Sequence, residues 1–309
     1  MLRRVLSAIP VMGVVALVVF LLLRLTPGDP AAVLAGDNAT PAQLERIRTS
    51  LGLNEPLYIQ FITWIGKLLH GDLGVSLISN VPVLKMIGQR VEPSISLAVA
   101  TIILSVLVAV PLGVIAAWKQ GTWIDRIVMG LSVLGFSVPV FVIGYVLMQI
   151  FAIDHRWLPV QGYKSIFDGF GPFFQRLVLP TLSLSFIYVA LIARMTRTSM
   201  LDVLGEDYVR TARAKGIGEI PVLFRHALRN DAVPVITVIG TGFALLISGV
   251  VVTESVFNLP GVGRLTVDAV LARDYPVIQA MILLTSLVYV TVNLLIDVAY
   301  TLLDPRIRY

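Results

Sequence analysis

Long apolar runs alternate with polar segments along this chain, and the pattern predicts helices that cross a membrane. Six runs are long enough to cross about 30 Å of hydrocarbon, which takes roughly 20 helical residues. We place them near residues 5–25, 96–118, 127–152, 177–197, 233–253 and 277–303. The predicted fold class is therefore an all-α membrane protein with six transmembrane helices.

The first run has an alternative interpretation as a secretory signal, because Arg3 and Arg4 precede it and a cleavage site is possible after Ala35. Its apolar stretch, however, extends from Val5 to Leu23. A signal core has only about 7–15 apolar residues. We therefore expect this run to be a membrane helix.

The segment 26–95 is too polar to span a membrane and too long to be a tight turn. Thr40 and Pro41 open a stretch that predicts a capped helix with a stop at Gly52. Residues 56–69, PLYIQFITWIGKLL, predict a second helix that is amphipathic. We expect this segment to form a small helical subdomain outside the membrane.

A polar, basic insert at residues 206–234 separates the fourth run from the fifth. Asp207 suits a helix start and Gly216 suits a left-handed C-cap, which predicts one short helix. A second helix is expected from about Pro221. Its apolar positions follow a 3.6-residue spacing at Ile220, Leu223, Phe224, Ala227 and Leu228. One interpretation of the second helix is a basic amphipathic helix that lies on anionic lipid.

Composition agrees with a membrane class, since 57% of the residues are hydrophobic and only 14% are charged. The sequence has no cysteine, which excludes disulfides and thiolate metal sites. The net charge of +5 does not require a nucleic-acid partner, because Lys and Arg gather in short segments between the runs. Such segments are typically cytoplasmic, so we expect both termini and residues 206–234 to lie inside.

The insert resembles the cytoplasmic "EAA" loop of ABC importer permeases. Its form, DYVRTARAKG followed by FRHALRN and Pro234, is similar to the oligopeptide/dipeptide permease family. The similarity extends to LTPGDPA near residue 28, and to LGLNEPLYIQF, HGDLGVS and ESVFNLPGVGRLTVDAVLARDYPVIQA. The generic motif begins Glu-Ala-Ala, where this chain has Arg210, Thr211 and Ala212. A role for an acidic first residue is therefore not carried over.

The resemblance implies a six-span subunit of the type I ABC importer permease kind, with an outer helical subdomain between the first two spans. We divide the chain into residues 1–91, with the first helix and that subdomain; residues 92–304, the permease core; and residues 305–309, a cytoplasmic tail. The subunit is expected in a bacterial or archaeal cytoplasmic membrane, where it carries a peptide or a similar small solute.

The resemblance also implies the partners. We expect a second homologous permease subunit, two ABC ATPase subunits, an extracytoplasmic solute-binding protein and the lipid membrane, and no nucleic acid. ATP and Mg would be bound by the ATPase subunits, so this chain is expected to be non-enzymatic, with no cofactor and no metal site of its own. The residues that bind the solute are not assigned.

Two candidate sites follow. The resemblance assigns ATPase docking to the first helix of the insert, at Asp207, Tyr208, Arg210, Thr211, Ala212, Lys215 and Gly216. The outer loop 254–276 has residues that would gate the pathway or contact the binding protein, at Glu254, Phe257, Pro260, Arg264 and Asp274. The simpler interpretation of this loop is a cap that packs Phe257, Leu259 and Val262 over the outer mouth.

Asp297 gives rise to a second hypothesis about function, because an acid inside a membrane span is costly and often functional. It would be the proton site of an autonomous proton-coupled secondary transporter. Alternatively, it makes a structural contact with Asn293, one turn earlier, or with a neighbouring helix. A single acid is a poor proton relay, which favours the structural interpretation.

Overall fold

The computed structural model describes residues 2–25, 31, 40–50, 52–230, 232–247 and 250–303. Within these ranges the regular structure is helical, apart from one isolated β-bridge between Val75 and Pro82. The helices are α1 (Leu2–Leu25), α3 (Pro41–Ser50), α4 (Leu57–Leu69), α5 (Val83–Trp118), α6 (Trp123–Ser137), α7 (Val140–Leu147), the π-helix η1 (Met148–Asp154), the 3-10 helix η2 (Ile166–Asp168), α8 (Phe170–Leu204), α9 (Asp207–Ala214), α10 (Glu219–Pro221), the π-helix η3 (Val222–Ala227), α11 (Leu228–Asn230), α12 (Ala232–Ile247), α13 (Val251–Val256), α14 (Val262–Leu271) and α15 (Tyr275–Leu303).

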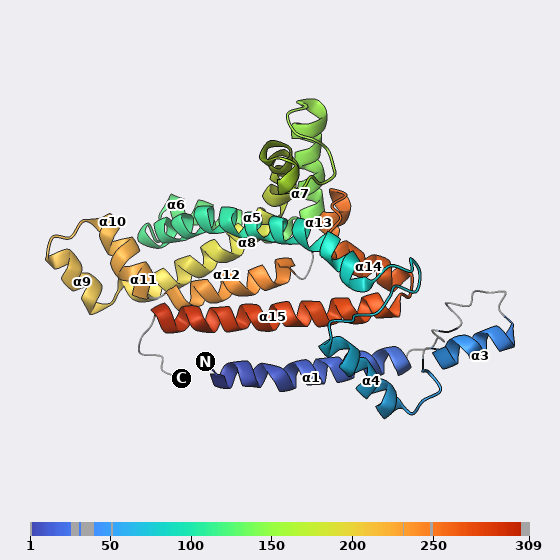
Figure 1. Ribbon diagram of the computed structural model, residues 1–309. Helices are drawn as coiled ribbons and strands as arrows, with labels where there is room; N and C mark the ends of the chain where they lie inside the picture. The colour runs from blue at the N-terminus through green and yellow to red at the C-terminus, as the bar shows by residue number, and fades with distance from the viewer. Residues whose placement is uncertain are drawn as a thin grey trace.

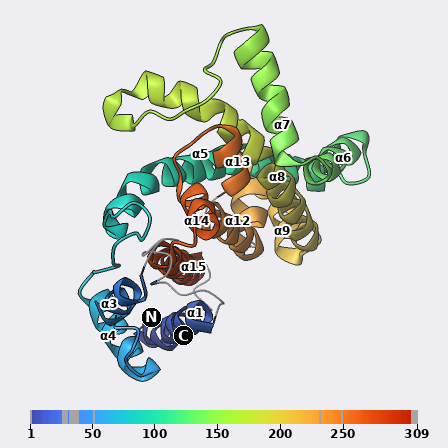
Figure 2. The ribbon, with the colours of Figure 1, turned by 90° about the vertical axis from the view of Figure 1, so that its right-hand side faces the viewer.

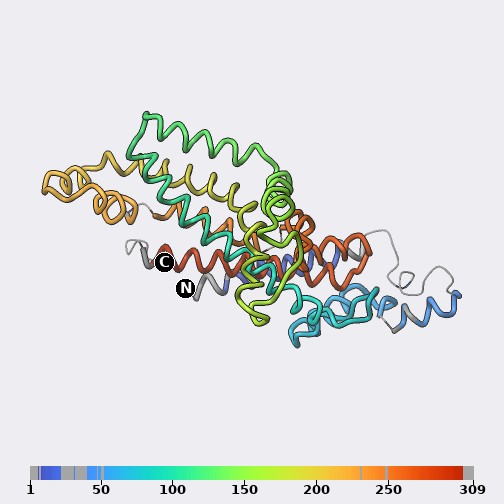
Figure 3. The backbone as a smooth tube through the Cα atoms, turned by 90° about the horizontal axis from the view of Figure 1, so that it is seen from above, coloured from blue at the N-terminus to red at the C-terminus, as the bar shows by residue number. Residues whose placement is uncertain are grey.

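The long helices extend between the same two ends of the molecule, with α5 at an angle to α15, and short helices lie at both ends (Figure 1). We call the end that carries α9, α10 and α11 the loop end, and the end that carries α13 and α14 the cap end. The view from above shows the same separation, with α9 and α3 at opposite extremes (Figure 3). The first turn of α1 and the last turn of α15 face the loop end (Figure 1).

Among the described residues, three helices are long and apolar enough to cross a membrane, namely α5, α8 and α15. They contain the runs expected near 96–118, 177–197 and 277–303. The number rises to five if each of two bent helix pairs counts as one span. The run expected near 5–25 forms α1. The count of six spans stays a prediction.

The run expected near 127–152 is sharply bent in the structure. These residues form α6 followed by α7 and η1, with a bend of 98° between the two parts. Proline has no N–H to donate and disfavours a helical residue before it. Val138 is accordingly extended, with φ −91° and ψ 122°, and Pro139 becomes the N-cap of α7. Pro139 therefore ends α6 and restarts the chain in a new direction.

The outer segment is helical as predicted. The backbone N–H of Gln43 donates to Thr40 Oγ1 at 3.3 Å, and the N–H of Thr40 donates to Gln43 Oε1 at 2.9 Å. This reciprocal pair is a capping box at the start of α3. Gly52 follows the helix with φ 67°, the left-handed conformation expected of the stop. The motif near residue 28 and the tail 305–309 lie largely or wholly outside the described residues.

The core of the bundle is the contact between α5 and α8. On α5 the buried positions are mostly small and recur about every four residues, at Ala98, Thr101, Ser105, Ala109, Gly113 and Ala117. A Cβ atom at Gly113 would lie 2.6 Å from the Ala193 carbonyl oxygen and 2.6 Å from Thr196 Cβ. Small residues let two helix backbones approach closely, which is the main way that helices pack in lipid. Glycine at residue 113 therefore sets the distance between α5 and α8.

We predict that Gly113→Ala destabilises the protein and that Gly130→Ala does not. Gly130 is an exposed glycine of α6, and a Cβ added there would have no atom within 4 Å, so it is a matched control. A helical Gly→Ala change without a clash stabilises by roughly 0.5–1 kcal/mol. At Gly113 the added methyl overpacks the contact, at a cost of about 1–3 kcal/mol. Thermal unfolding in detergent should show a lower midpoint for Gly113→Ala alone, and equal midpoints for both variants would contradict this packing.

Candidate functional site

The predicted docking helix α9 ends in a complete Schellman cap. Gly216 has φ 74°, in the left-handed region. Its N–H donates to the Arg213 carbonyl at 2.9 Å, and the Ile217 N–H donates to the Ala212 carbonyl at 3.3 Å. These are the two bonds that define this cap. No atom lies within 4 Å of a Cβ at residue 216, so the need for glycine is conformational, and the predicted C-cap is confirmed.

α9 is fastened to the ends of the two core helices. Val209 and Ala212 are buried on its inner side. They belong to an apolar cluster that includes Val114 of α5, Met200 of α8 and Leu223 of η3. α9 therefore packs directly on α5 and α8.

Most of the predicted docking residues lie on the outer side of α9. The exposed ones are Asp207, Tyr208, Arg210, Thr211, Lys215 and Gly216. Ala212 differs, because its side chain packs against the chain's own helices. Its position indicates that it holds α9 in place and offers no side chain to a partner at the surface.

Only part of the apolar stripe expected on the second helix is buried in the structure. Val222 and Ala227 are both buried, although they are five residues apart. A π-helix bonds residues at i and i+5, so η3 brings these two positions to the same side. Ile220 and Phe224, which also belong to the expected stripe, are exposed. Together with Tyr208 they give the loop end an exposed apolar and aromatic surface.

Ion pairs connect the parts of this loop only weakly. Arg213 Nη2 lies 2.7 Å from Glu219 Oε1, which joins the end of α9 to the start of α10. Arg210 Nη1 lies 3.4 Å from Asp207 Oδ1 within α9. These side chains are at least one-third exposed, and surface pairs of this kind contribute about 0–1 kcal/mol. The apolar cluster, and not these pairs, holds the loop in place.

An ion pair that sequence analysis missed joins α6 to α8 near the loop end. Arg197 Nε and Nη2 donate to the two carboxylate oxygens of Asp125 at 2.5 and 2.8 Å. The Gly121 N–H adds a third bond to Asp125 at 3.0 Å. Asp125 is buried, and a bidentate pair of this kind fixes geometry as well as distance. No local pattern connects two residues 72 positions apart.

At the cap end, Glu254 is a buried helix cap. Its Oε2 accepts the Arg264 N–H at 2.8 Å, and its Oε1 accepts the Ser94 hydroxyl at 2.7 Å. Ser94 Oγ in turn accepts the Val262 N–H at 2.8 Å, so both acceptors satisfy the first turn of α14. A side chain at Gly261 would overlap the carboxylate. Burial raises the pKa of the Glu254 carboxyl, and the hydrogen bonds from Ser94 and Arg264 partly oppose that shift.

Asp274 is also buried, and it ties the segment before α5 to the start of α15. It accepts hydrogen bonds from the Ser76 hydroxyl and from the Leu77 N–H, the latter at 3.1 Å. Seen from the cap end, α13 and α14 lie in front of the bundle (Figure 2). This arrangement attaches the cap to the bundle through side chains from distant parts of the sequence.

The cap residues expected to gate the pathway or to contact a binding protein are therefore mostly internal. Glu254, Phe257 and Asp274 are all buried. Glu254 and Asp274 accept hydrogen bonds from backbone and hydroxyl donors, and Phe257 packs in the core. Only Pro260 and Arg264 are partly exposed. The packing expected of a cap is confirmed, with Phe257, Leu259 and Val262 all buried.

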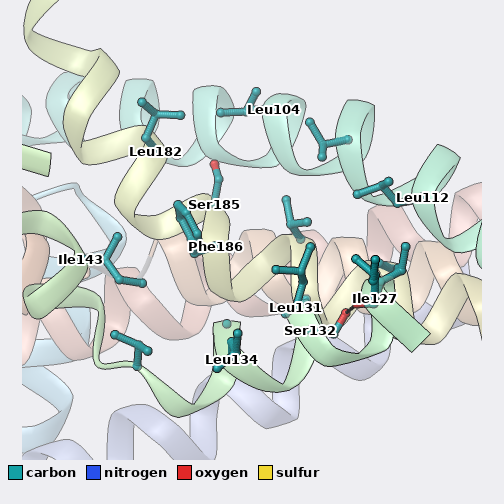
Figure 4. Close-up of a pocket in the computed structure, with 17 residues that line it drawn as sticks. Leu104, Leu112, Ile127, Leu131, Ser132, Leu134, Ile143, Leu182, Ser185 and Phe186 are labelled. Carbon is teal, nitrogen blue, oxygen red and sulfur yellow. Dashed lines mark hydrogen bonds between the residues drawn. The ribbon is translucent and has the colours of Figure 1, made fainter. Parts of the chain in front are cut away.

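A pocket of about 540 Å³ lies between α5, α6 and α8 (Figure 4). Its walls are apolar, with Leu104, Leu112, Ile127, Leu131 and Phe186 among the lining residues. A site that recognises a polar small molecule needs a few placed polar groups in addition to apolar walls. The pocket therefore does not have the chemistry of a site for a peptide.

Comparison with known proteins gives one consistent result. Residues 109–309 match the family described as binding-protein-dependent transport system inner membrane component. Residues 1–98 match the N-terminal membrane-component family of the same transport systems.

Several related permeases match this chain over its whole length. The chain is 58% identical to a probable peptide ABC transporter permease of Sinorhizobium fredii, over 100% of this chain and 98% of the relative. It is 45% identical, with the same coverage, to a putative peptide transport system permease of Brucella abortus and to a glutathione transport system permease of Salmonella typhi. The chain therefore belongs to the family of inner membrane components of binding-protein-dependent transport systems.

Proposed function

We propose that this permease subunit forms half of the translocation pathway of an ATP-driven importer for a peptide or a similar small solute. A second homologous permease would complete the pathway. Two ATPase subunits, which hold ATP and Mg, would bind at the loop end, and a solute-binding protein would deliver solute at the cap end. The names of the relatives support a peptide or glutathione-like cargo.

The observation that carries the proposal is the construction of α9. Its outer side is exposed, basic and aromatic, and its inner side packs on α5 and α8. Lys215, Arg225 and Arg229 add exposed positive charge around it. A helix of this kind can bind a partner on one side and move the membrane helices with the other.

α5 then connects the two ends of the molecule. Val114 belongs to the apolar cluster around α9, and Ser94 hydrogen-bonds to Glu254 in the cap. These two residues lie about 30 Å apart along a helix that rises 1.5 Å per residue. ATP-driven closure of the ATPase subunits would displace α9, and α5 and α8 would transmit that displacement to the cap.

The proposed orientation puts both termini and the loop end in the cytoplasm. The first turn of α1, the last turn of α15 and α9 all lie at the loop end (Figure 1). The basic segments of the chain gather there as well, as expected of the cytoplasmic side. In this account the chain is a non-catalytic subunit, and ATP hydrolysis belongs to its partners.

Charge reversal on α9 tests the docking site. Arg210 is 71% exposed and contacts Asp207 three residues earlier. We expect the partner face to be complementary to this basic loop, so Arg210→Glu should weaken ATPase binding about tenfold or more, or ~1.4 kcal/mol. Co-purification with the ATPase subunits and solute-stimulated ATP hydrolysis would measure the effect.

The matched control is Arg48→Glu on α3. Arg48 is also on a helix surface and also pairs with an acid three residues earlier, Glu45, at 3.7 Å. Its helix, α3, lies at the opposite extreme of the molecule from α9 (Figure 3). Arg48→Glu should leave both readouts unchanged. If the two variants behave alike, α9 is not the docking site.

The energy source separates this function from a proton-coupled carrier. Asp297 is half-buried on α15, and its backbone carbonyl accepts the Thr301 hydroxyl at 3.0 Å. Asp297→Asn should retain most ATP-driven uptake and lose at most about 1 kcal/mol of stability, because an amide still offers a donor and an acceptor. A protonophore should not stop uptake while the ATP concentration is held constant. An assembled but inactive variant, together with protonophore sensitivity, would indicate a proton carrier.

A further inference from the structure

The outer helix α4 has three distinct sides, and the first packs on the membrane helix α1. Phe61 and Trp64 of α4 contact the buried ring of Phe20, with ring centroids 5.3 and 5.7 Å apart. Phe20 lies close to the end of α1 that faces the cap end. α4 is therefore fixed beside the last turns of α1.

The second side of α4 is an apolar stripe that the described structure leaves uncovered. Tyr58, Ile62 and Leu69 fall on one face of the helix, because their spacing of four and then seven residues follows the helical repeat. Their exposed fractions are 67%, 66% and 82%. Exposure of three large apolar side chains on one helix face to water is unfavourable in free energy, so this stripe requires an apolar neighbour.

The third side of α4 is polar. Thr63 and Lys67 are exposed, are four residues apart and lie on a different face from the stripe. Lys67 is the one charged residue of the helix. α4 thus presents a protein-facing side, an apolar side and a water-facing side, which is the pattern of a helix that lies in a membrane interface.

α4 packs beside α1, whose exposed apolar side chains would face lipid if α1 crosses the bilayer, and to this extent the inference rests on the proposed function. Among the described side chains of α1, the large exposed apolar ones are Leu6, Ile9, Val11, Val14, Leu17 and Val18. Trp64 and Tyr58 are the aromatic types that concentrate at the membrane–water boundary. We propose that α4 lies in the outer interface of the bilayer and that Tyr58, Ile62 and Leu69 insert into lipid.

Site-directed spin labelling tests this directly, because the chain has no cysteine that would need to be removed. Single cysteines are introduced as Ile62→Cys and Leu69→Cys on the stripe, and as Thr63→Cys and Lys67→Cys on the polar side as matched controls. Each labelled subunit is assembled with its partner subunits in vesicles of phosphatidylethanolamine and phosphatidylglycerol. Collision with molecular oxygen, which partitions into lipid, is compared with collision with a water-soluble nickel chelate.

We expect the labels at residues 62 and 69 to collide preferentially with oxygen, and the labels at 63 and 67 to collide preferentially with the nickel chelate. Equal access to the chelate at all four positions would overturn the proposal, because the stripe would then face water. Immobilised labels that neither reagent reaches would also overturn it, and would show that a protein covers the stripe. ATP-driven uptake by each labelled transporter is recorded separately, so that a failure of transport is distinguished from a failure of lipid contact.

Discussion

The close contact of α5 with α8 is the constraint on which the rest of this molecule depends. It exists because Gly113 has no side chain to separate the two backbones, and because the positions around it on α5 are mostly small. The same pair of helices supports α9 at one end through Val114 and Met200. At the other end, Ser94 of α5 joins the hydrogen bonds that start α14. In the proposed mechanism, this pair of helices would connect the two surfaces.

The two ends of this unit are built by different physical means. The loop end is held by apolar packing, and its ion pairs are mostly at the surface, so its outer side stays available to a partner. The cap end is held by the buried acids Glu254 and Asp274, which satisfy backbone and hydroxyl donors. Loss of one partner from a buried hydrogen bond lowers stability, because the remaining polar group is left unsatisfied. The position of the cap is therefore fixed more strictly than that of the loop. This contrast fits a docking surface at one end and a fixed closure at the other.

Local sequence signals predicted the helix ends well. The cap at Thr40 and the left-handed glycines at residues 52 and 216 depend only on neighbouring residues, so a short stretch of sequence is enough to identify them. The π-helix η3 was missed because one extra residue in a turn changes which side chains are buried without any local signal. The burial of Glu254 was missed because its donors come from Ser94 and Arg264, one of which is 160 residues away. The ends of α9 were therefore predictable from the sequence, whereas the internal role of the cap acids required the tertiary structure.

The most direct measurement is a cross-link from the loop end of the assembled transporter. Thr211→Cys places a thiol on the exposed side of α9 in a chain that has no other cysteine, and Ser79→Cys places one on the exposed segment that leads into α5 at the opposite end. A short thiol-to-amine cross-linker applied to membranes should join the Thr211→Cys variant to an ATPase subunit and leave the Ser79→Cys variant unlinked to it. An ATPase adduct from Ser79→Cys, with none from Thr211→Cys, would contradict both the docking site and the orientation of the chain.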